Sequence, residues 1–293
     1  MVVLVTGANG QLGQAIQFIS KNHKEIGFVF CSSSELDITN FENCKAVFEE
    51  FQPSFCINTA AYTAVDKAES ESKKAHLINA VGPENLAKVC KEYNTILVHV
   101  STDFVFDGIS TTLNMKKGYK ETDIPNPQSV YGQTKLDGEL AIQKIWEKHF
   151  IVRTSWVYSQ FSANFMKTML RLASEKDTLS IVSDQIGTPT NAIDLAEALI
   201  KIVDYCSAEF ISASNYGIYN FSNEGYCSWY DFANEIFHQK GISIDLKPIP
   251  TLAYPTPAKR PAYSVLDKSK IKRTFNIAIK EWQTSLAECL NQL

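Results

Sequence analysis

The N-terminal junction between a short apolar run and a glycine-rich turn restricts the fold more than any other feature. Val2–Val5 is apolar throughout, as expected of a buried β-strand, and the glycine-rich segment Thr6–Gly13 follows it directly. Gly7, Gly10 and Gly13 permit a tight turn, a close approach of the main chain to a phosphate, and close packing of the next helix on the strand. That helix would point its free N–H groups and the positive end of its dipole at the phosphate. The junction predicts a site for the diphosphate of a dinucleotide cofactor.

The rest of the first half alternates apolar runs with amphipathic stretches. Further strands are expected at Phe28–Cys31, Phe55–Asn58, Ile96–Ser101 and Phe150–Ser155. The expected helices are Gln14–Lys21, Phe41–Phe51, Ala75–Tyr93 and Tyr131–Trp146. Nearly continuous apolar strands that alternate with helices indicate a parallel sheet covered on both faces. The predicted fold class is α/β, a doubly wound parallel sheet of the Rossmann type.

In the second half, apolar runs and amphipathic stretches alternate less regularly, which predicts a smaller lobe. We expect residues 1–157 to form the NAD(P)-binding domain and residues 158–293 mainly a substrate-binding lobe, with residues 190–222 returning to the first domain. Helices are expected at Asn164–Ser174, Ala192–Tyr205 and Ser228–Lys240, and the proline-rich segment Lys247–Pro261 is expected to be irregular.

Composition excludes several classes of protein. The 293 residues are 45% hydrophobic and carry a net charge of −4, so the chain can bury a core but offers no broad basic surface for nucleic acid. No apolar stretch approaches the roughly 20 residues of a membrane span, and the N-terminal run is too short for a signal peptide. Seven scattered cysteines without a Cys-x-x-Cys pair favour buried thiols, and five dispersed histidines argue against structural zinc. We expect a cytoplasmic protein that binds neither nucleic acid nor membrane.

The end of the second expected strand bears on the choice of cofactor. An acidic residue there would bind the ribose 2′-hydroxyl and repel a 2′-phosphate, but Cys31 is followed by the serines of Ser32–Ser34. We therefore expect NADPH, with NADH also accepted. Asp37 and Ile38 are expected at the adenine, and a helix cap near Phe41 is the alternative role for Asp37.

Tyr131 and Lys135 are four residues apart, and hence on one face of the helix expected there. The spacing alone is weak evidence, because roughly one such pair occurs by chance in a chain of this composition. The context is stronger, since Ser101 and Thr102 end the fourth expected strand, where ligands of a doubly wound sheet gather. A ketone that receives hydride needs a positioned acid, and a neighbouring ammonium favours an ionised phenol. We expect Tyr131 to donate the proton and Lys135 to support it; a surface tyrosine and a solvated lysine are the alternative.

Several longer segments resemble one family, the dTDP-4-dehydrorhamnose reductases, which are extended short-chain dehydrogenases/reductases. The resemblance covers essentially the whole chain, and it is carried by Thr63–Glu69, Ser101–Phe106, Tyr131–Lys135, Arg153–Tyr158, Asp184–Thr190 and Tyr254–Pro261. It implies reduction of the C4 ketone of dTDP-4-dehydro-β-L-rhamnose to dTDP-L-rhamnose.

The resemblance also implies roles for single residues. For the cofactor it places Gly10, Gln11 and Leu12 at the diphosphate, Asp37 and Ile38 at the adenine, and Ala60, Ala61 and Thr63 along the ribose and nicotinamide. For the substrate it implies contacts from Val65, Thr102, Asp103 and Trp156, with Thr102 tuning the tyrosine. Arg260 suits a diphosphate as a planar donor fork, and a surface role is the alternative. Trp156 would otherwise be a core residue.

One departure from the family concerns a metal. Some members dimerise through a magnesium ion held by glutamates, and the corresponding positions here are Ala15 and Ile193. Neither offers the oxygen ligands that a hard cation needs. We therefore expect no metal, and a monomer or weak homodimer.

Two other functions remain open from the sequence. A nucleotide-sugar epimerase or other reductase of the same class would use the same acid and cofactor. A regulatory subunit, resembling the partner of methionine adenosyltransferase, would need neither Tyr131 nor Lys135.

Overall fold

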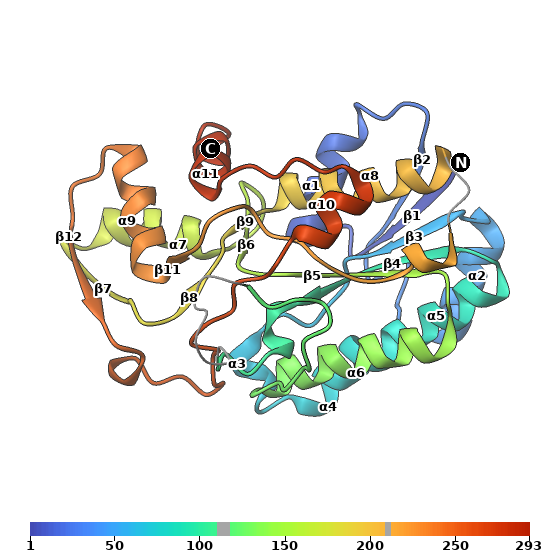
Figure 1. Cartoon of the computed structure of the whole chain (residues 1–293), viewed down its shortest axis with the longest axis horizontal. Coiled ribbons are helices and arrows are strands. Elements are labelled where there is room, and N and C mark those ends of the chain that lie inside the picture. Colours follow the sequence, from blue (N-terminus) through green and yellow to red (C-terminus); the bar gives the residue numbers. More distant parts are fainter. Residues whose placement is uncertain (110–117, 209–211) are drawn as a thin grey trace.

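A six-stranded parallel sheet forms the centre of the protein (Figure 1). The computed structural model describes residues 1–109, 118–208 and 212–293. The strands are β1 (Val2–Thr6), β2 (Gly27–Cys31), β3 (Phe55–Asn58), β4 (Ile96–Thr102), β5 (His149–Thr154) and β10 (Gly217–Asn220). They lie in the order β2-β1-β3-β4-β5-β10, with every neighbouring pair parallel. The predicted fold class is confirmed, and the chain reverses its direction of winding between β1 and β3.

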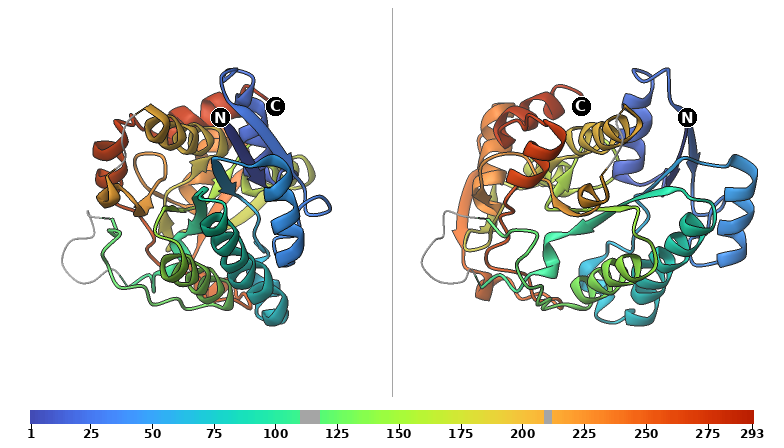
Figure 2. Two further views of the ribbon diagram at one scale, coloured as in Figure 1. Left: turned by 90° about the vertical axis from the view of Figure 1, so that its right-hand side faces the viewer. Right: turned by 45° about the vertical axis from the view of Figure 1, so that its right-hand side comes forward.

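Helices cover both faces of this sheet, as the two views of Figure 2 show. One face packs against α1 (Gln11–Ser20), α8 (Ala192–Ala208) and α10 (Ser269–Phe275). The other packs against α2 (Phe41–Phe51), α5 (Gly82–Glu92) and α6 (Val130–Ile145). Side chains alternate between the two faces along each strand: Val3 and Val5 enter the first apolar cluster and Leu4 the second. The continuous apolar runs in the sequence therefore reflect burial on both faces.

The helix expected over Ala75–Tyr93 is interrupted. It consists of α4 (Ser72–His76), a π-helical turn (Leu77–Val81) and α5. The wider turn holds Asn79, whose side chain accepts a bond from Tyr62 N at 2.8 Å and donates to Tyr62 O at 3.0 Å. Single π turns of this kind concentrate at functional sites, and apolar periodicity does not reveal them.

A third apolar cluster organises the smaller lobe. This lobe contains β6 (Val157–Tyr158), α7 (Phe165–Glu175), β7 (Thr178–Val182), β8 (Ile186–Gly187), β9 (Thr190–Asn191), β11 (Cys227–Ser228), α9 (Trp229–Lys240), β12 (Asp245–Ile249) and α11 (Trp282–Leu290). The expectation of an irregular segment from Lys247 is wrong at its start, because 247–249 belong to β12, which pairs with β7. Pro248 fits there because β12 is an edge strand.

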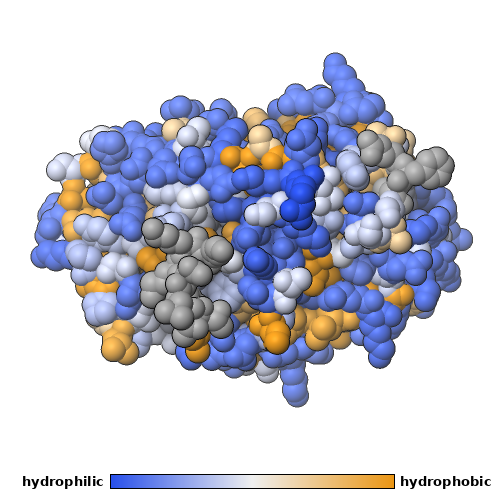
Figure 3. Space-filling model, viewed as in Figure 1, coloured by the Kyte–Doolittle hydropathy of each residue, from blue (hydrophilic) through white to orange (hydrophobic). Residues whose placement is uncertain are grey.

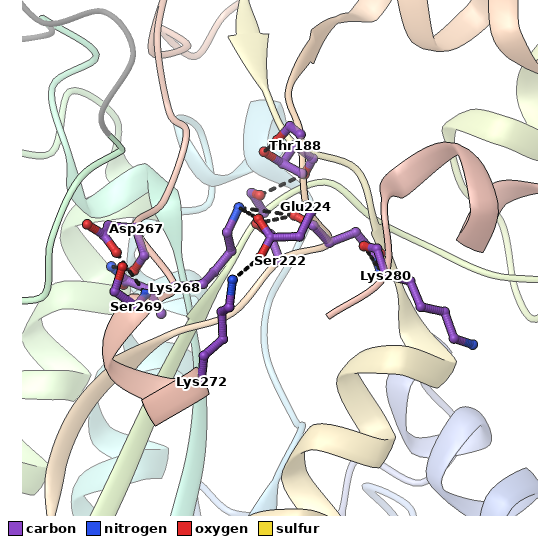
Figure 4. Close-up of polar contacts among 12 residues, drawn as sticks. Thr188, Ser222, Glu224, Asp267, Lys268, Ser269, Lys272 and Lys280 are labelled. Atoms are coloured by element: carbon purple, nitrogen blue, oxygen red, sulfur yellow. Dashed lines mark hydrogen bonds and ion pairs between the residues drawn. The ribbon is translucent and has the colours of Figure 1, made fainter. Parts of the chain in front are cut away.

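The chain passes between sheet and lobe more than once. Residues 192–220 supply α8, which packs on α1, and β10, which pairs with β5. Just after β10, Glu224 lies 2.7 Å from Lys272 and 3.4 Å from Lys268, and both lysines point at it in Figure 4. These ion pairs fasten the crossing segment to α10. The exact division into domains at residue 157 stays a prediction.

The surface, the helices and the cysteines can be compared with what the composition of the chain predicted. Hydrophilic residues predominate on the face shown in Figure 3, where apolar residues form small separate groups. Within the described ranges, every helix is too short or too polar to cross a bilayer. The seven cysteines are free thiols, six of them buried and Cys206 half-buried.

Candidate functional site

A cavity of about 870 Å³ opens at the carboxyl ends of the strands, where sheet and smaller lobe meet. A doubly wound sheet binds ligands at this edge. The cavity lies next to the point between β1 and β3 where the winding direction of the chain reverses. The cavity is lined by the predicted residues Gly7, Gly10, Gln11, Leu12, Asp37, Ile38, Ala60, Ala61, Thr63, Val65, Thr102, Asp103, Tyr131, Lys135, Trp156 and Arg260. The structure therefore brings together residues that lie up to 253 positions apart in the chain, from Gly7 to Arg260. Gly13 is the one predicted residue that does not line the cavity.

The glycine turn forms the floor of one end. Gly7 has φ +67°, and a Cβ there would lie 2.7 Å from Ala60 N. A Cβ on Gly13 would lie 2.4 Å from Gly7 O, so this glycine lets α1 pack on the turn. Gly10 is the N-cap of α1, and the first residues of this helix, Gln11 and Leu12, line the cavity. This cradle, with no acidic side chain in the first turn of α1, fits the diphosphate of NADP or NAD.

The segment after β2 lines another part of the cavity. Ser33 and Asp37 line the cavity, whereas the carboxylate of Glu35 folds back and accepts bonds from Ser32 N and Oγ, both at 2.7 Å. The alternative role for Asp37 as a helix cap is wrong, because Asn40 caps α2. Asp37 Oδ1 instead accepts from Thr39 N and Oγ1.

Tyr131 lies near the start of α6, which Ser129 caps by accepting a bond from Gly132 N at 3.1 Å. Its ring meets Phe104 edge to face at 5.5 Å. Burial raises the pKa of Tyr131 to about 12; a bond with the Thr102 side chain lowers it and the Asp103 charge raises it. In the protein alone burial outweighs the Thr102 bond, and the expected effect of the Lys135 ammonium and the cationic nicotinamide together stays a prediction. A phenol that keeps its proton at rest suits a proton donor.

Lys135 follows one turn later and is buried. Its Nζ donates to Val100 O at 2.8 Å and lies 3.2 Å from His99 Nε2. Burial lowers the pKa of Lys135 to about 8, and the charge of Glu139 acts in the opposite direction.

Behind Lys135 lies a buried ion pair that the sequence analysis missed. Arg153 on β5 donates through Nε and Nη2 to the carboxylate of Glu139, the shortest contact being 2.6 Å. Ser101 Oγ donates to the same carboxylate at 2.5 Å. Ser101 lines the cavity, as expected, but its hydroxyl donates to Glu139. A charged residue inside the apolar run of β5 was the available signal.

Asp103 is a buried acidic residue that lines the cavity, and its charge acts on Tyr131. It is 1% exposed, and burial raises its pKa to about 6. Oδ1 accepts from Thr102 Oγ1 at 3.0 Å, whereas Oδ2 has no hydrogen-bond partner among the described residues. A buried carboxylate oxygen that lacks a partner and lines a cavity is suited to accept a ligand hydroxyl.

Trp156, just after β5, lines the cavity. Its backbone is left-handed, with φ +46°, and its ring stacks on Trp229 at 3.6 Å between centroids. A Cβ on Gly187 would lie 2.6 Å from the Trp156 ring. The strained backbone and the tight stacking fix this indole at the cavity. Trp229, at the start of α9, also lines the cavity and was missed in the sequence.

Arg260 reaches the cavity from the C-terminal part of the chain. Its guanidinium pairs with Asp66 in α3 (Val65–Ala68), with Nη2 2.8 Å from Oδ2 and Nη1 3.1 Å from Oδ1. Nη1 also donates to Thr256 Oγ1 at 2.5 Å. Its pairing with Asp66 was not anticipated, and it ties the proline-rich loop to α3.

The two positions that correspond to metal ligands in some relatives lie in apolar surroundings. Ala15 on α1 is fully buried in the apolar cluster on that face of the sheet, and Ile193 on α8 packs against the same cluster. Elsewhere, His23, Glu25 and Asp204 each bring a ligand atom within 4.8 Å of the others, but none of them lines the cavity. The absence of a metal from the reaction stays a prediction.

Comparison with known proteins shows the family of the chain. Residues 1–293 match the family described as RmlD substrate binding domain. A dTDP-4-dehydrorhamnose reductase of Aggregatibacter actinomycetemcomitans is 42% identical, over 97% of this chain and 96% of the relative. A crystal structure of such a reductase from Clostridium acetobutylicum is 42% identical, with a TM-score of 0.92 over 100% of this chain and 99% of that one. Another, from Bacillus anthracis in complex with NADP, is 36% identical, with a TM-score of 0.91 over the same shares. The chain therefore belongs to the RmlD family, as the resemblance of its sequence segments implied.

Proposed function

We propose that the protein reduces the C4 ketone of dTDP-4-dehydro-β-L-rhamnose with NADPH, giving dTDP-L-rhamnose, the last step of dTDP-rhamnose biosynthesis. The observation that carries this proposal is the shared cavity: the glycine turn, Thr102, Tyr131 and Lys135 all line it. The family membership supports the choice of substrate. An NADP-bound relative supports the choice of cofactor, with NADH as a second donor.

The chain's own residues supply binding and the proton. Gly7, Gly10, Gln11 and Leu12 would hold the diphosphate, and the segment at Asp37 and Ile38 the adenine. Bound there, NADPH supplies the hydride. Tyr131 Oη donates the proton that the developing alkoxide takes up, and Thr102 steadies the phenol. Lys135 orients the nicotinamide ribose, and Ala60, Ala61 and Thr63 shape its path.

The sugar would lie between Tyr131 and the smaller lobe. Asp103 Oδ2 is available to accept a sugar hydroxyl, and the Trp156 indole gives the ring an apolar wall. Val65 closes the pocket from the side of α3. We place Arg260 near the diphosphate of the substrate, held in position by Asp66.

The test mixes the purified protein with NADPH and the 4-keto-6-deoxy sugar nucleotide, made by the upstream epimerase. Loss of one NADPH per sugar reduced, with dTDP-L-rhamnose identified by NMR, is the expected result. Isomerisation without loss of NADPH would identify an epimerase instead. No turnover, together with copurification of methionine adenosyltransferase, would identify a regulatory subunit.

We also propose that this reaction takes place in the cytoplasm. Seven free thiols and no disulfide among the described residues fit a reducing compartment. Fractionation of cells that express a tagged chain tests this location.

A further inference from the structure

Gln11 contacts two parts of the molecule, one through its main chain and one through its side chain. It is the first residue of α1, so its main-chain N–H belongs to the free donors of the cradle that fits a diphosphate. Its side chain bonds to residues of the smaller lobe that lie 146 to 153 positions later in the chain. One residue therefore joins the glycine turn to the start of the smaller lobe.

Three hydrogen bonds fix the Gln11 amide. Its Nε2 donates to Val157 O at 3.0 Å, and its Oε1 accepts from Ser159 Oγ at 3.0 Å and from Asn164 Nδ2 at 2.8 Å. Both lone pairs of Oε1 are thus used. The orientation is set by the main chain, because Lys167 N donates to Asn164 Oδ1 and leaves Nδ2 to face Gln11.

Asn164 continues this connection into the smaller lobe. It is the N-cap of α7, where its Oδ1 accepts from Lys167 N at 3.1 Å. Its Nδ2 also donates to Ser159 O at 2.7 Å, and the fully buried Ser159 accepts in turn from Phe161 N at 3.1 Å. These bonds hold the turn before α7 and the first residues of α7 together, next to α1.

The start of α7 packs on an aromatic wall of the cavity, formed by Phe165, Trp229 and Trp156. Phe165, the first residue of α7, lies 4.6 Å from Trp229 between ring centroids, and Trp229 stacks on Trp156 at 3.6 Å. All three residues line the cavity together with the glycine turn. A shift of α7 against α1 would therefore move the aromatic wall relative to a bound cofactor.

A second glutamine of α1 makes a weaker connection to the same segment. Gln14 Nε2 donates to Ser162 Oγ at 3.0 Å and to Asn9 O at 2.9 Å. These bonds are exposed, so water replaces them at little cost, whereas the three bonds of Gln11 are partly buried. Gln11 is thus the more important contact, and Gln14 offers a matched control on the same helix.

We propose that Gln11 is a positioning residue of the reductase: its side chain, through Val157, Ser159 and Asn164, holds the aromatic wall in place relative to the cofactor bound at its main chain. The catalytic meaning of this inference rests on the proposed function. A sugar that packs on the wall is then presented to the nicotinamide, so the loss of the connection weakens productive binding of the sugar nucleotide.

The first test uses the full-length protein without substrate, so its outcome does not depend on the proposed function. Gln11→Met keeps the length of the side chain and removes all three bonds. Hydrogen exchange followed by mass spectrometry should show the amides of 159–167 exchanging about tenfold faster, with peptides of β4 unchanged. Gln14→Met should leave the exchange of 159–167 within about twofold. Equal exchange of this segment in the unmodified protein and in Gln11→Met would overturn the proposal.

The second test separates positioning from a merely structural role. In Gln11→Met the KM for the sugar nucleotide should rise about tenfold, while kcat and the Kd of NADPH stay within about twofold, because Tyr131 and the main-chain donors of the turn remain. Gln14→Met should change none of the three by more than about twofold. An unchanged KM in Gln11→Met, or an equal loss of NADPH affinity, would contradict the proposal. An unmodified protein without turnover would overturn the proposed function, and the exchange measurement would still decide whether Gln11 holds the segment.

The third test identifies the bond between Gln11 and Asn164 as the connection. Asn164→Ser removes Nδ2 but keeps a helix cap, since a serine hydroxyl can accept from Lys167 N. It should raise the KM for the sugar nucleotide as Gln11→Met does. If both substitutions break one connection, the double variant should have the KM of the more impaired single variant. Effects that multiply to about a hundredfold would show two independent causes and contradict the proposal.

Discussion

Tyr131 is positioned as an acid by residues from three elements. Thr102 from β4 bonds its hydroxyl, Phe104 packs against its ring, and α6 carries Lys135 one turn away. Burial raises its pKa to about 12, so the hydroxyl keeps its proton at neutral pH in the protein without cofactor. The donor is thus defined by its surroundings rather than by the Tyr-x-x-x-Lys spacing alone.

Tyr131→Phe should lower kcat by about 10²–10⁴-fold, because only the transferable proton is removed. The Kd of NADPH, measured by fluorescence titration, should stay within about twofold of the unmodified protein, since the ring still packs on Phe104. Tyr205→Phe, outside the cavity, is the matched control and should leave kcat unchanged. A Tyr131→Phe variant with near-normal turnover would refute the assignment.

Asp103 should make substrate binding depend on pH. Its folded-state pKa is raised from 3.8 to about 6, so the carboxylate is present above about pH 6 and is lost as the pH falls through that value. We expect the KM for the sugar nucleotide to rise roughly tenfold between pH 7 and pH 5, as a charge-assisted bond is lost. Initial rates across this range, compared with Asp103→Asn, check the expectation. An unchanged pH dependence of KM in Asp103→Asn would rule out this carboxylate.

Some residues of the site could be predicted from the sequence and others could not. The glycine turn, Thr102 and Tyr131 were found because each belongs to a local pattern, and Trp156 was found because its segment resembles one family. His99, Glu139 and Arg153 belong to none, because their partners lie on other elements and are set by strand order. A charged or polar residue inside an apolar strand was the available sign, although it did not name a partner.

At the scale of elements, β5 and α6 are joined by the Glu139–Arg153 ion pair. Both side chains are essentially inaccessible, with exposures of 0% and 2%. Their contribution to stability depends on pairing, because either charge alone would be left buried without a partner. The pair also fixes the helix turn that carries Lys135 against the sheet.

Arg153→Met should therefore destabilise the fold by about 3–5 kcal/mol, since it leaves the Glu139 carboxylate unpaired. The double variant Glu139→Leu/Arg153→Met should recover much of that loss, because no buried charge remains. Urea unfolding followed by circular dichroism measures both. A loss of less than about 1 kcal/mol in the single variant would show that the pair is not needed for stability.

Elements were predictable to different degrees. The five strands of the first half were found within one or two residues, because burial on both faces produces unbroken apolar runs. The π-helical turn at Leu77–Val81 was not, since it depends on the bond between Asn79 and Tyr62 from another segment. β12 was missed because Pro248 indicates a loop, and only its edge position makes that proline acceptable.

At the scale of the whole molecule, the cavity exists because sheet and smaller lobe are tied together at several points. Arg260 pairs with Asp66, and Glu224 pairs with Lys268 and Lys272. These ion pairs join segments that are distant in the sequence, so the pairing cannot be recognised from either residue alone. The fold class was predictable from local patterns, whereas the ion pairs that hold the segments around the cavity were not.

The assembly of the whole molecule should not depend on magnesium. Ala15 and Ile193 occupy apolar positions and offer no oxygen ligand. Light scattering should give the same mass, that of a monomer or weak dimer, with and without Mg²⁺, and EDTA should leave the turnover rate unchanged. Magnesium-dependent dimerisation or activity sensitive to chelation would contradict this.

The central claim is that hydride from a nicotinamide reaches the C4 carbon of the sugar in this cavity. It is tested most directly with NADPH deuterated at both C4 positions of the nicotinamide, mixed with the 4-keto-6-deoxy sugar nucleotide. The account predicts one deuterium at C4 of the rhamnosyl product for each NADPH oxidised, seen by NMR, and its loss in Tyr131→Phe at equal time. A product without deuterium at C4, or conversion with no NADPH oxidised, would contradict it.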